Sequence, residues 1–547
     1  MITLHYHDQT KHHFRRFARS VGYLDWATQP DPFRRYDGAP VAELPRARVA
    51  DAVPYAALFD GTAPAAPFTR PSIAEFLRCS MGLSAWKQYG ASRWALRVNP
   101  SSGNLHPTEA YLLAEGRLWH YAPREHALEE RGRLDEAAWT GWFRSPSGAE
   151  GFLVALTSIH WREAWKYGER AFRYCQHDAG HAIGALRLAA ALLGWQLALL
   201  PRWSDAQLAT LLGLDRDADF PDAEREEPEC LAVVSGGDAS WWVARDPEAL
   251  VDAARMAAWR GTANRLSPGR VEWPMIDEIA AVTRYPGGRD PEAGIRGPGS
   301  GIGNRRTLAP SDAPPHRRTA APSHQRGTSA RAILLQRRSA LAFDRESGLS
   351  RDAFAGMLRR LRPPSPPWDA IDWLPHVHLA LFVHRVEGLA PGVYAYLRDP
   401  AVLPEWTAAM RQEFLWAAVN DPDDLFLLAP LDCRRLANRV SCDQDIAEDG
   451  FFSLAMIARV ESSLREHGEW FYRRLYWECG LIGQVLYLEA ETTGGRATGI
   501  GCFYDDPVHD VLGLSGHTWQ SLYHFSMGVP VDDPRLTTEP GYGWETR

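Results

Sequence analysis

Arg337, Arg338 and Ser339 form a short polar stretch whose side chains could grip a phosphate group. Each guanidinium group offers a planar fork of hydrogen-bond donors, and the serine adds a neutral hydroxyl. The stretch follows residues 330–336, which have helical spacing. A solvated basic patch that continues an arginine-rich segment is the alternative interpretation, and these residues alone leave both open.

A second polar loop contains Pro100, Ser101, Ser102 and Asn104 around Gly103. Two hydroxyls and an amide lie next to a glycine, whose backbone can adopt conformations that other residues rarely adopt. The loop could therefore direct hydrogen bonds to the edge of a planar heterocycle. An ordinary turn is the alternative, because these are also the commonest turn residues.

A third motif is the glycine pair in Gly499, Ile500, Gly501 and Cys502. Such a pair permits the close approach of a ligand or of another backbone. It is not a dinucleotide-binding fingerprint, because the third glycine and the strand-before-helix order are missing. The glycine-rich run at 297–303 has no flanking strand, and we interpret it as linker.

Lys166 and Tyr167 are two potential proton-transfer groups just before a long apolar stretch. Desolvation or a nearby cation can bring a lysine or a tyrosine into the range useful for a general base. The alternative is a charged surface segment that leads into a helix. The second half of the chain has Glu466 and His467 at the equivalent positions, so this chemistry would belong to the first half.

The chain repeats itself at an offset of 300 residues, as Gly168, Glu169, Arg173 and Gly180 recur at Gly468, Glu469, Arg473 and Gly480. The polar motifs are divided between the two copies. The 100–104 loop occurs only in the first copy, whereas 337–339 and 499–501 occur only in the second. This division predicts one composite site at the junction of the halves.

Composition restricts the class of protein. The 547 residues are too many for one hydrophobic core, and 45% hydrophobic with 23% charged residues is typical of globular proteins. A net charge of −8 gives no reason to expect a nucleic-acid partner. Seven cysteines without a C-x-x-C pair argue against a disulfide framework and a zinc site, so we expect no metal and a reducing cytoplasm.

Four segments are predicted along the chain: an N-terminal extension at 1–70, a first unit at 71–284, a Gly/Pro/Arg-rich linker at 285–329 and a second unit at 330–547. The polar N-terminus does not resemble a secretory signal. The apolar stretch 179–200 contains a histidine and an arginine, so we expect a core helix followed by a strand and no membrane span.

Helical spacing predicts helices over 73–80, 352–361, 179–194 and 480–494, the last two rich in small residues that permit close helix contact. Strand patterns cover 110–113, 230–234, 378–383 and 522–525. Helices that alternate with a few strands, in two similar copies, predict an α+β unit that dimerises within one chain.

Taken together, these motifs resemble the nitroreductase superfamily, and most closely its azoline-dehydrogenase branch, the SagB/ThcOx type. Residues 6–12, 24–26, 165–170 and 532–536 add to the resemblance, which covers most of both repeats and omits the linker. It implies two nitroreductase-like α+β domains that form an intramolecular pseudo-dimer, with FMN in a cleft between them.

The resemblance also implies roles for individual residues. The R-R-S motif, here Arg337, Arg338 and Ser339, would hold the FMN phosphate together with a late arginine, here Arg535. The 499–502 loop would contact the flavin near N5, and Pro100, Ser101, Ser102 and Asn104 would reach it from the opposite half. Lys166 and Tyr167 would be the pair that removes a proton from an azoline ring.

Three departures from the family pattern matter. The first repeat lacks the R-R-S motif and has 199–203 in place of the glycine loop, while the second has a proline-rich stretch at 362–367 in place of the 100–104 loop. Leu341 stands where a third cation for the phosphate is usual, which should weaken FMN binding. A pseudo-dimer would have two FMN sites at its interface. The three missing motifs would all belong to one of these sites, so we expect one FMN per chain.

We therefore expect an FMN-dependent oxidoreductase, in which a small-molecule or peptide substrate gives a hydride to flavin N5 while Lys166 or Tyr167 takes a proton. An alternative with the same fold and cofactor is an NAD(P)H-dependent reductase of nitro or quinone compounds. A further alternative is a non-catalytic scaffold that uses the fold. No nucleic-acid or membrane partner is expected under any of them.

Overall fold

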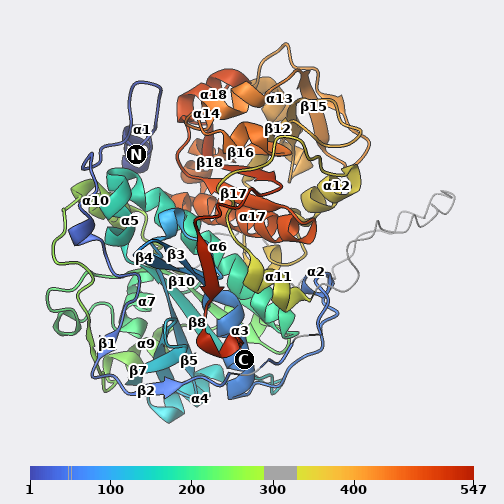
Figure 1. Ribbon diagram of the computed structural model, residues 1–547. Helices are drawn as coiled ribbons and strands as arrows, with labels where there is room; N and C mark the ends of the chain where they lie inside the picture. The colour runs from blue at the N-terminus through green and yellow to red at the C-terminus, as the bar shows by residue number, and fades with distance from the viewer. Residues whose placement is uncertain (47, 51, 289–328, 547) are drawn as a thin grey trace.

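The computed structural model describes the chain except for residues 47, 51, 289–328 and 547. Most of the expected linker, 285–329, therefore lies outside the described residues. Two seven-stranded antiparallel sheets, each covered by helices, form two halves, coloured blue to green and yellow to red in Figure 1. This mixture of helices and sheets confirms the predicted α+β class.

The sheet of the first half is buried through its centre. Its strands lie in the order β2 (Val41–Glu43), β7 (Ala127–Arg133), β6 (Arg117–Ala122), β5 (Thr108–Ala114), β8 (Gly151–Ser158), β10 (Glu227–Ser235) and β9 (Gln196–Leu199). Alternate residues of β8 belong to two different apolar clusters, with Phe152 and Val154 in one and Leu153 and Ala155 in the other. Successive side chains of a strand point to opposite faces, so both faces of this sheet are covered.

The sheet of the second half repeats most of this order. Its strands are β14 (Ala417–Ala418), β15 (Leu425–Pro430), β13 (Gly392–Tyr396), β12 (Val377–Val383), β16 (Phe452–Arg459), β18 (Trp519–Gly528) and β17 (Arg496–Ile500). The edge strands differ in origin, because β2 comes from the N-terminal segment and β14 from within the second half. The strands predicted from sequence lie inside β5, β10, β12 and β18.

Two central helices of 22 residues each, α6 (Ala171–Leu192) and α17 (Phe471–Thr492), pack against each other at the junction of the halves (Figure 1). A Cβ on Gly180 would overlap the Trp477 carbonyl oxygen, and one on Gly480 would overlap that of His177. The predicted close contact through small residues is therefore confirmed. In the described part of the chain, no helix has the length and apolar character needed to cross a membrane.

Shorter helices pack either on the central helix pair or on the outer faces of the two sheets. In the first half they are α2 (Ala57–Asp60), α3 (Arg70–Ser80), α4 (Glu136–Phe143), α5 (His160–Tyr167), α7 (Asp205–Leu212), α8 (Ser240–Val243), α9 (Glu248–Arg255) and α10 (Pro274–Val282). In the second half they are α11 (Ala330–Gln336), α12 (Arg351–Arg360), α13 (Leu403–Ala409), α14 (Arg434–Val440), α15 (Ile446–Asp449), α16 (Glu461–His467) and α18 (Asp505–Leu512). The helices predicted at 73–80 and 352–361 correspond to α3 and α12.

Both chain ends cross from one half to the other. The C-terminal strand β19 (Thr537–Pro540) pairs with β3 (Leu83–Tyr89), which pairs with β4 (Ser92–Arg97), and Figure 1 shows the red C-terminal segment lying over the first half. At the N-terminus, α1 (Ile2–Gln9) buries Tyr6 and His7. The His7 ring hydrogen-bonds Tyr472 and Gln520 of the second half. A small two-stranded sheet, β1 (Tyr36–Asp37) with β11 (Thr262–Ala263), completes the fold.

Candidate functional site

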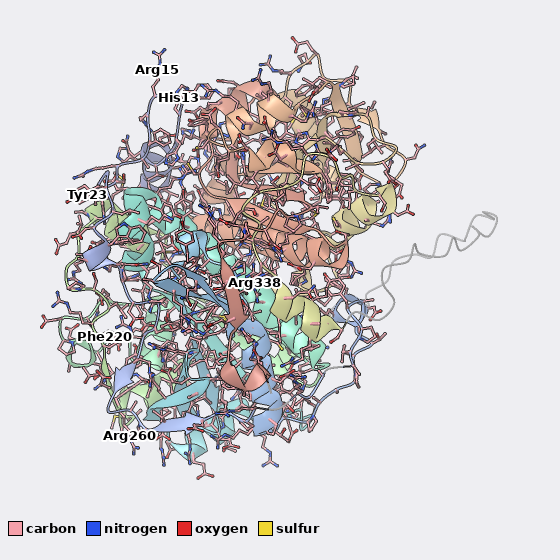
Figure 2. The ribbon with its side chains drawn as sticks, viewed as in Figure 1. His13, Arg15, Tyr23, Phe220, Arg260 and Arg338 are labelled. Atoms are coloured by element: carbon pink, nitrogen blue, oxygen red, sulfur yellow. The ribbon has the colours of Figure 1, made fainter. Side chains whose placement is uncertain are left out.

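A cavity of about 840 Å³ lies where the two halves meet. The first half contributes β3, β4, the 99–106 segment and α6, and the second contributes residues 336–341, the end of β17 and the C-terminal arm. Arg338, which lines the cavity, is labelled in Figure 2 at the boundary between the halves. The volume lies within the range of sites that enclose small molecules and cofactors.

Most residues singled out in the sequence line this one cavity. They are Pro100, Ser101, Ser102, Asn104, Tyr167, Arg337, Arg338, Ser339, Gly499, Ile500, Gly501 and Cys502. Lys166 lies beside the cavity, since a Cβ on Gly103 would be 3.1 Å from its Nζ. Arg535 itself does not line the cavity, although its neighbours Pro534 and Leu536 do. Its guanidinium pairs with Asp533 at 2.7 Å and faces the ring of Tyr89.

Backbone carbonyls of the first half hold both guanidinium groups of the R-R-S motif. Arg337 donates to the carbonyl oxygens of Val98 and Arg97, both at 3.1 Å. Arg338 donates to the carbonyl of Ser84 at 2.8 Å. Carbonyl groups orient the guanidinium groups without neutralising their charge. Among the residues that the structure describes, no carboxylate lies within ion-pair distance of either guanidinium group, although the Glu491 carboxylate accepts from the Arg338 backbone amide at 3.1 Å.

Two further cations, Lys87 on β3 and Arg496 on β17, line the same cavity. Burial and the charges of Arg338 and Arg496 lower the pKa of Lys87. Burial and Arg337 lower the pKa of Arg338 to about 10. Crowded cations are stabilised by an anion, so this part of the cavity suits a phosphate. No motif marks Lys87 or Arg496 in the sequence.

Tyrosine side chains lie so close to Gly499 and Gly501 that neither position has space for a side chain. A Cβ on Gly499 would overlap the Tyr523 hydroxyl, and one on Gly501 would overlap the ring of Tyr174. The Gly499 amide donates to the Tyr487 hydroxyl at 2.9 Å. The structure shows close approach by these side chains, and both glycines also line the cavity, so the expected approach by a ligand stays a prediction.

Two buried carboxyl groups hold the 100–104 loop. The Ser102 amide and hydroxyl donate to Asp178 at 3.1 and 3.2 Å, and the Ser101 hydroxyl donates to Glu163 at 3.5 Å. Burial raises the pKa of Asp178 to about 7 and raises that of Glu163 well above its ordinary value. The pair therefore retains a proton near neutral pH.

Sequence reasoning missed both carboxyl groups. Glu163 lies on α5, three and four residues before Lys166 and Tyr167, so helical spacing could have placed it on their face. Asp178 lies on α6. No local pattern connects that position with the loop.

Tyr167 and Lys166 differ in the proton chemistry that their surroundings allow. Burial raises the pKa of Tyr167 well above its ordinary value, so its phenol is protonated at neutral pH and is available as a hydrogen-bond donor. The Lys166 Nζ lies 5.1 Å from the centre of the Tyr167 ring. Three kinds of group therefore surround the 100–104 loop: the Tyr167 phenol as a hydrogen-bond donor, the Lys166 amine and the buried carboxyl pair.

Residues 91–223 match the model of the Nitroreductase family. The matched segment includes the 100–104 loop, Lys166 and Tyr167, together with the carboxyl pair. Comparison with curated proteins finds no match.

Solved structures show where the fold recurs. A candidate nitroreductase of Anabaena variabilis is 20% identical, with 97% of this chain and 99% of that chain covered and a TM-score of 0.67. A candidate nitroreductase of Ralstonia eutropha is 17% identical over 39% of this chain and 95% of its own, with a TM-score of 0.26. The E. coli microcin synthetase complex McbBCD with truncated pro-MccB17 bound is 17% identical over 43% of this chain and 80% of that chain, with a TM-score of 0.25. The likeness to the Anabaena protein extends over both halves. The chain therefore has a nitroreductase-like fold, and residues 91–223 of its first half match the family model.

Proposed function

We propose that the chain is an FMN-dependent oxidoreductase with one composite flavin site, built from two copies of one nitroreductase-like unit. The observation that carries the proposal is the cavity that joins the 100–104 loop of one half to residues 337–339 and 499–502 of the other. The recurrence of strand order in the two sheets supports the internal pseudo-dimer.

The residues around the cavity fit FMN. Lys87, Arg337 and Arg338 provide the positive charge that a phosphate needs, whereas Arg496 also pairs with Asp532 at 2.7 Å. The polar 100–104 loop provides donors and acceptors for a ring edge. Leu341 also lines the cavity. Lys87, on a strand of the opposite half, would supply the third phosphate-binding cation that is missing at position 341.

FMN, when bound, would supply the two-electron acceptor chemistry. Lys166 would accept the acidic proton of the substrate carbon, and Tyr167 would orient the substrate through its phenolic hydrogen. The Glu163–Asp178 pair, which retains one proton near neutral pH, would place its remaining negative charge near the ammonium ion formed. Resemblance to the azoline-dehydrogenase branch supports an azoline-like ring in a peptide or small molecule as the substrate.

A reductase that uses NAD(P)H to reduce nitro or quinone compounds is the second candidate, favoured by the family model that residues 91–223 match. Anaerobic mixing with NADH or NADPH separates the two directions of electron flow. Rapid bleaching of the flavin absorbance favours the reductase, and an unchanged spectrum favours the dehydrogenase.

The ratio of FMN to chain in purified protein tests the composite site. Flavin released by heat is measured by absorbance and compared with the protein concentration. We expect a ratio near one. A ratio of two would contradict the loss of the second site, and a colourless protein that does not take up added FMN would favour a scaffold.

A further inference from the structure

Two cysteines and a histidine from distant segments meet beside the cavity. Cys442 follows α14, Cys502 follows β17 and His12 follows α1. The Cys502 Sγ lies 2.8 Å from the Cys442 Sγ and 3.7 Å from the His12 Nδ1. These two thiols therefore face each other directly.

The pair is accessible from the cavity. Cys502 lines the cavity, and both cysteines are half-buried. Four of the other cysteines, Cys79, Cys175, Cys433 and Cys479, are buried. Cys230 is half-buried, but it belongs to no such cluster in the described part of the chain.

The surroundings make Cys502 the nucleophilic member of the pair. The hydrogen bond from the Cys442 thiol lowers the pKa of Cys502 to about 5, and His12 and Arg170 add to the effect. The same contact raises the pKa of Cys442. Thiol–disulfide exchange proceeds by attack of a thiolate, so a thiolate at Cys502 next to a thiol at Cys442 gives an attacking and a resolving group.

A single side chain holds the two cysteine segments together. The Gln444 amide donates to the Cys502 carbonyl at 2.9 Å and to the Ser441 carbonyl at 2.8 Å. Arg170 donates to the Gly501 carbonyl at 3.1 Å. These bonds keep the two sulfurs facing each other without any covalent link.

We propose that Cys442 and Cys502 form a thiol–disulfide exchange site that opens into the cavity and is oxidised by low-molecular-weight disulfides such as glutathione disulfide. The Cys502 thiolate attacks one sulfur of the disulfide, its S–S bond breaks, and one thiolate leaves. Cys442 loses its proton to solvent and attacks the Cys502 sulfur, which releases the second thiolate. Two protein thiols are oxidised to one disulfide, and the small disulfide is reduced to two thiols.

The distance between the sulfurs favours this chemistry over metal binding. Two thiolates bound to one zinc ion at roughly 2.3 Å, with tetrahedral angles, stand roughly 3.8 Å apart. The observed 2.8 Å is shorter. The site requires no flavin, so it goes beyond the proposed oxidoreductase function and stands without it.

Mass spectrometry of the full-length protein tests the proposal. The protein is incubated with reduced or oxidised glutathione, its free thiols are blocked with iodoacetamide, and trypsin is added. Cys442 and Cys502 are the single cysteines of tryptic peptides 440–459 and 497–535. We expect these two peptides to be linked after oxidised glutathione and separate after reduction.

Three variants assign the roles. C442S should accumulate a mixed disulfide between glutathione and Cys502, because the resolving thiol is missing. C502S should leave Cys442 largely unmodified under the same conditions. The matched control C230S should form the link as the wild type does.

Two results would overturn the proposal. One is a wild-type protein whose two cysteines stay alkylatable and unlinked across all glutathione ratios. The other is one equivalent of zinc that copurifies with the chain and blocks both thiols. Equal coupling of glutathione to Cys442 in C502S would overturn the assignment of Cys502 as the nucleophile.

Discussion

Lys166 and Tyr167 lie at the same loop, and burial argues against the tyrosine as the proton acceptor. Burial keeps the Tyr167 phenol protonated by raising its pKa. The Lys166 Nζ is close enough to the 100–104 loop that a Cβ on Gly103 would be 3.1 Å away. Proton removal should therefore depend on the lysine, with the tyrosine as an orienting donor.

Replacing Lys166 by alanine should abolish oxidation of a thiazoline-containing peptide, with a loss of at least about 100-fold, the lower range for a general base. The flavin absorbance spectrum should stay unchanged, because the lysine does not line the phosphate region. Initial rates and the visible spectrum check both statements. Lys11→Ala removes a lysine paired with Asp506 at 3.0 Å and should keep the rate. Full activity of Lys166→Ala would place the base elsewhere.

The carboxyl pair predicts how stability changes with pH. Asp178 titrates at about 7 when folded, whereas an unperturbed aspartate titrates near about 4. The folded state binds the extra proton between these values, so the free energy of unfolding falls as pH rises through this window. Asp178→Asn removes that titration.

The loss of unfolding free energy between pH 5 and pH 8 should therefore be smaller in Asp178→Asn than in the wild type. Urea unfolding of both proteins at the two pH values measures the difference. Asp252→Asn, which changes an exposed side chain, should behave like the wild type. Identical losses in Asp178→Asn and wild type would show that Asp178 carries no extra proton.

At the scale of elements, the crossing of α6 and α17 positions both sides of the cavity. Gly180 and Gly480 allow each helix backbone to approach the other, and neither position has space for a side chain. Tyr174 on α6 and Tyr487 on α17 both line the cavity. Separation of the helices would therefore change the site as well as the core.

Gly480→Ala should lower the free energy of unfolding by about 1–3 kcal/mol, because an added methyl group must push the two helices apart. Gly356→Ala is the matched control, since a Cβ there meets nothing within 4 Å and the change should be neutral or stabilising. Denaturant unfolding compares the two variants. Equal stability of Gly480→Ala and wild type would contradict the tight crossing.

At the scale of the whole molecule, the C-terminal arm connects the two halves around the cavity. Leu536 and Thr538 line the cavity, and Tyr542 is buried with Leu83 and Ala95 of the first half. The Tyr542 hydroxyl donates to the Pro123 carbonyl at 2.6 Å. The arm therefore contributes to both stability and the site.

A chain that ends at Leu536 should unfold at a lower temperature and retain less FMN. Loss of one buried aromatic side chain alone removes about 1.5–3 kcal/mol of burial free energy. Differential scanning fluorimetry and the flavin ratio measure the two effects. Tyr542→Phe, which keeps the ring but removes the hydrogen bonds of the hydroxyl with Pro123, Leu83 and Tyr121, should show a smaller loss of stability. A truncated chain with unchanged melting and flavin content would contradict the role of the arm.

The sequence by itself determined the elements that have strong local periodicity, including the two central helices and the strands β5, β10, β12 and β18. It also predicted which polar loops belong together, because the repeat shows that each half carries a different subset. The 100–104, 337–339 and 499–502 segments do line one cavity. Other strands were missed, among them β8, β16 and the C-terminal strand β19. The strand β19 has no burial period to detect, because it is exposed along its length and takes its place by pairing with a distant partner.

The tertiary structure alone decided the contacts between residues far apart in the chain. It placed Lys87 among the arginines, Asp178 against the serine loop and Cys442 against Cys502. It also assigned the glycine pair at 499 and 501 to the packing of tyrosines. A local sequence pattern reports which residues of a single helix or strand are buried. These contacts depend instead on how elements of the two halves pack against each other. The spacing of residues along the sequence does not specify that packing.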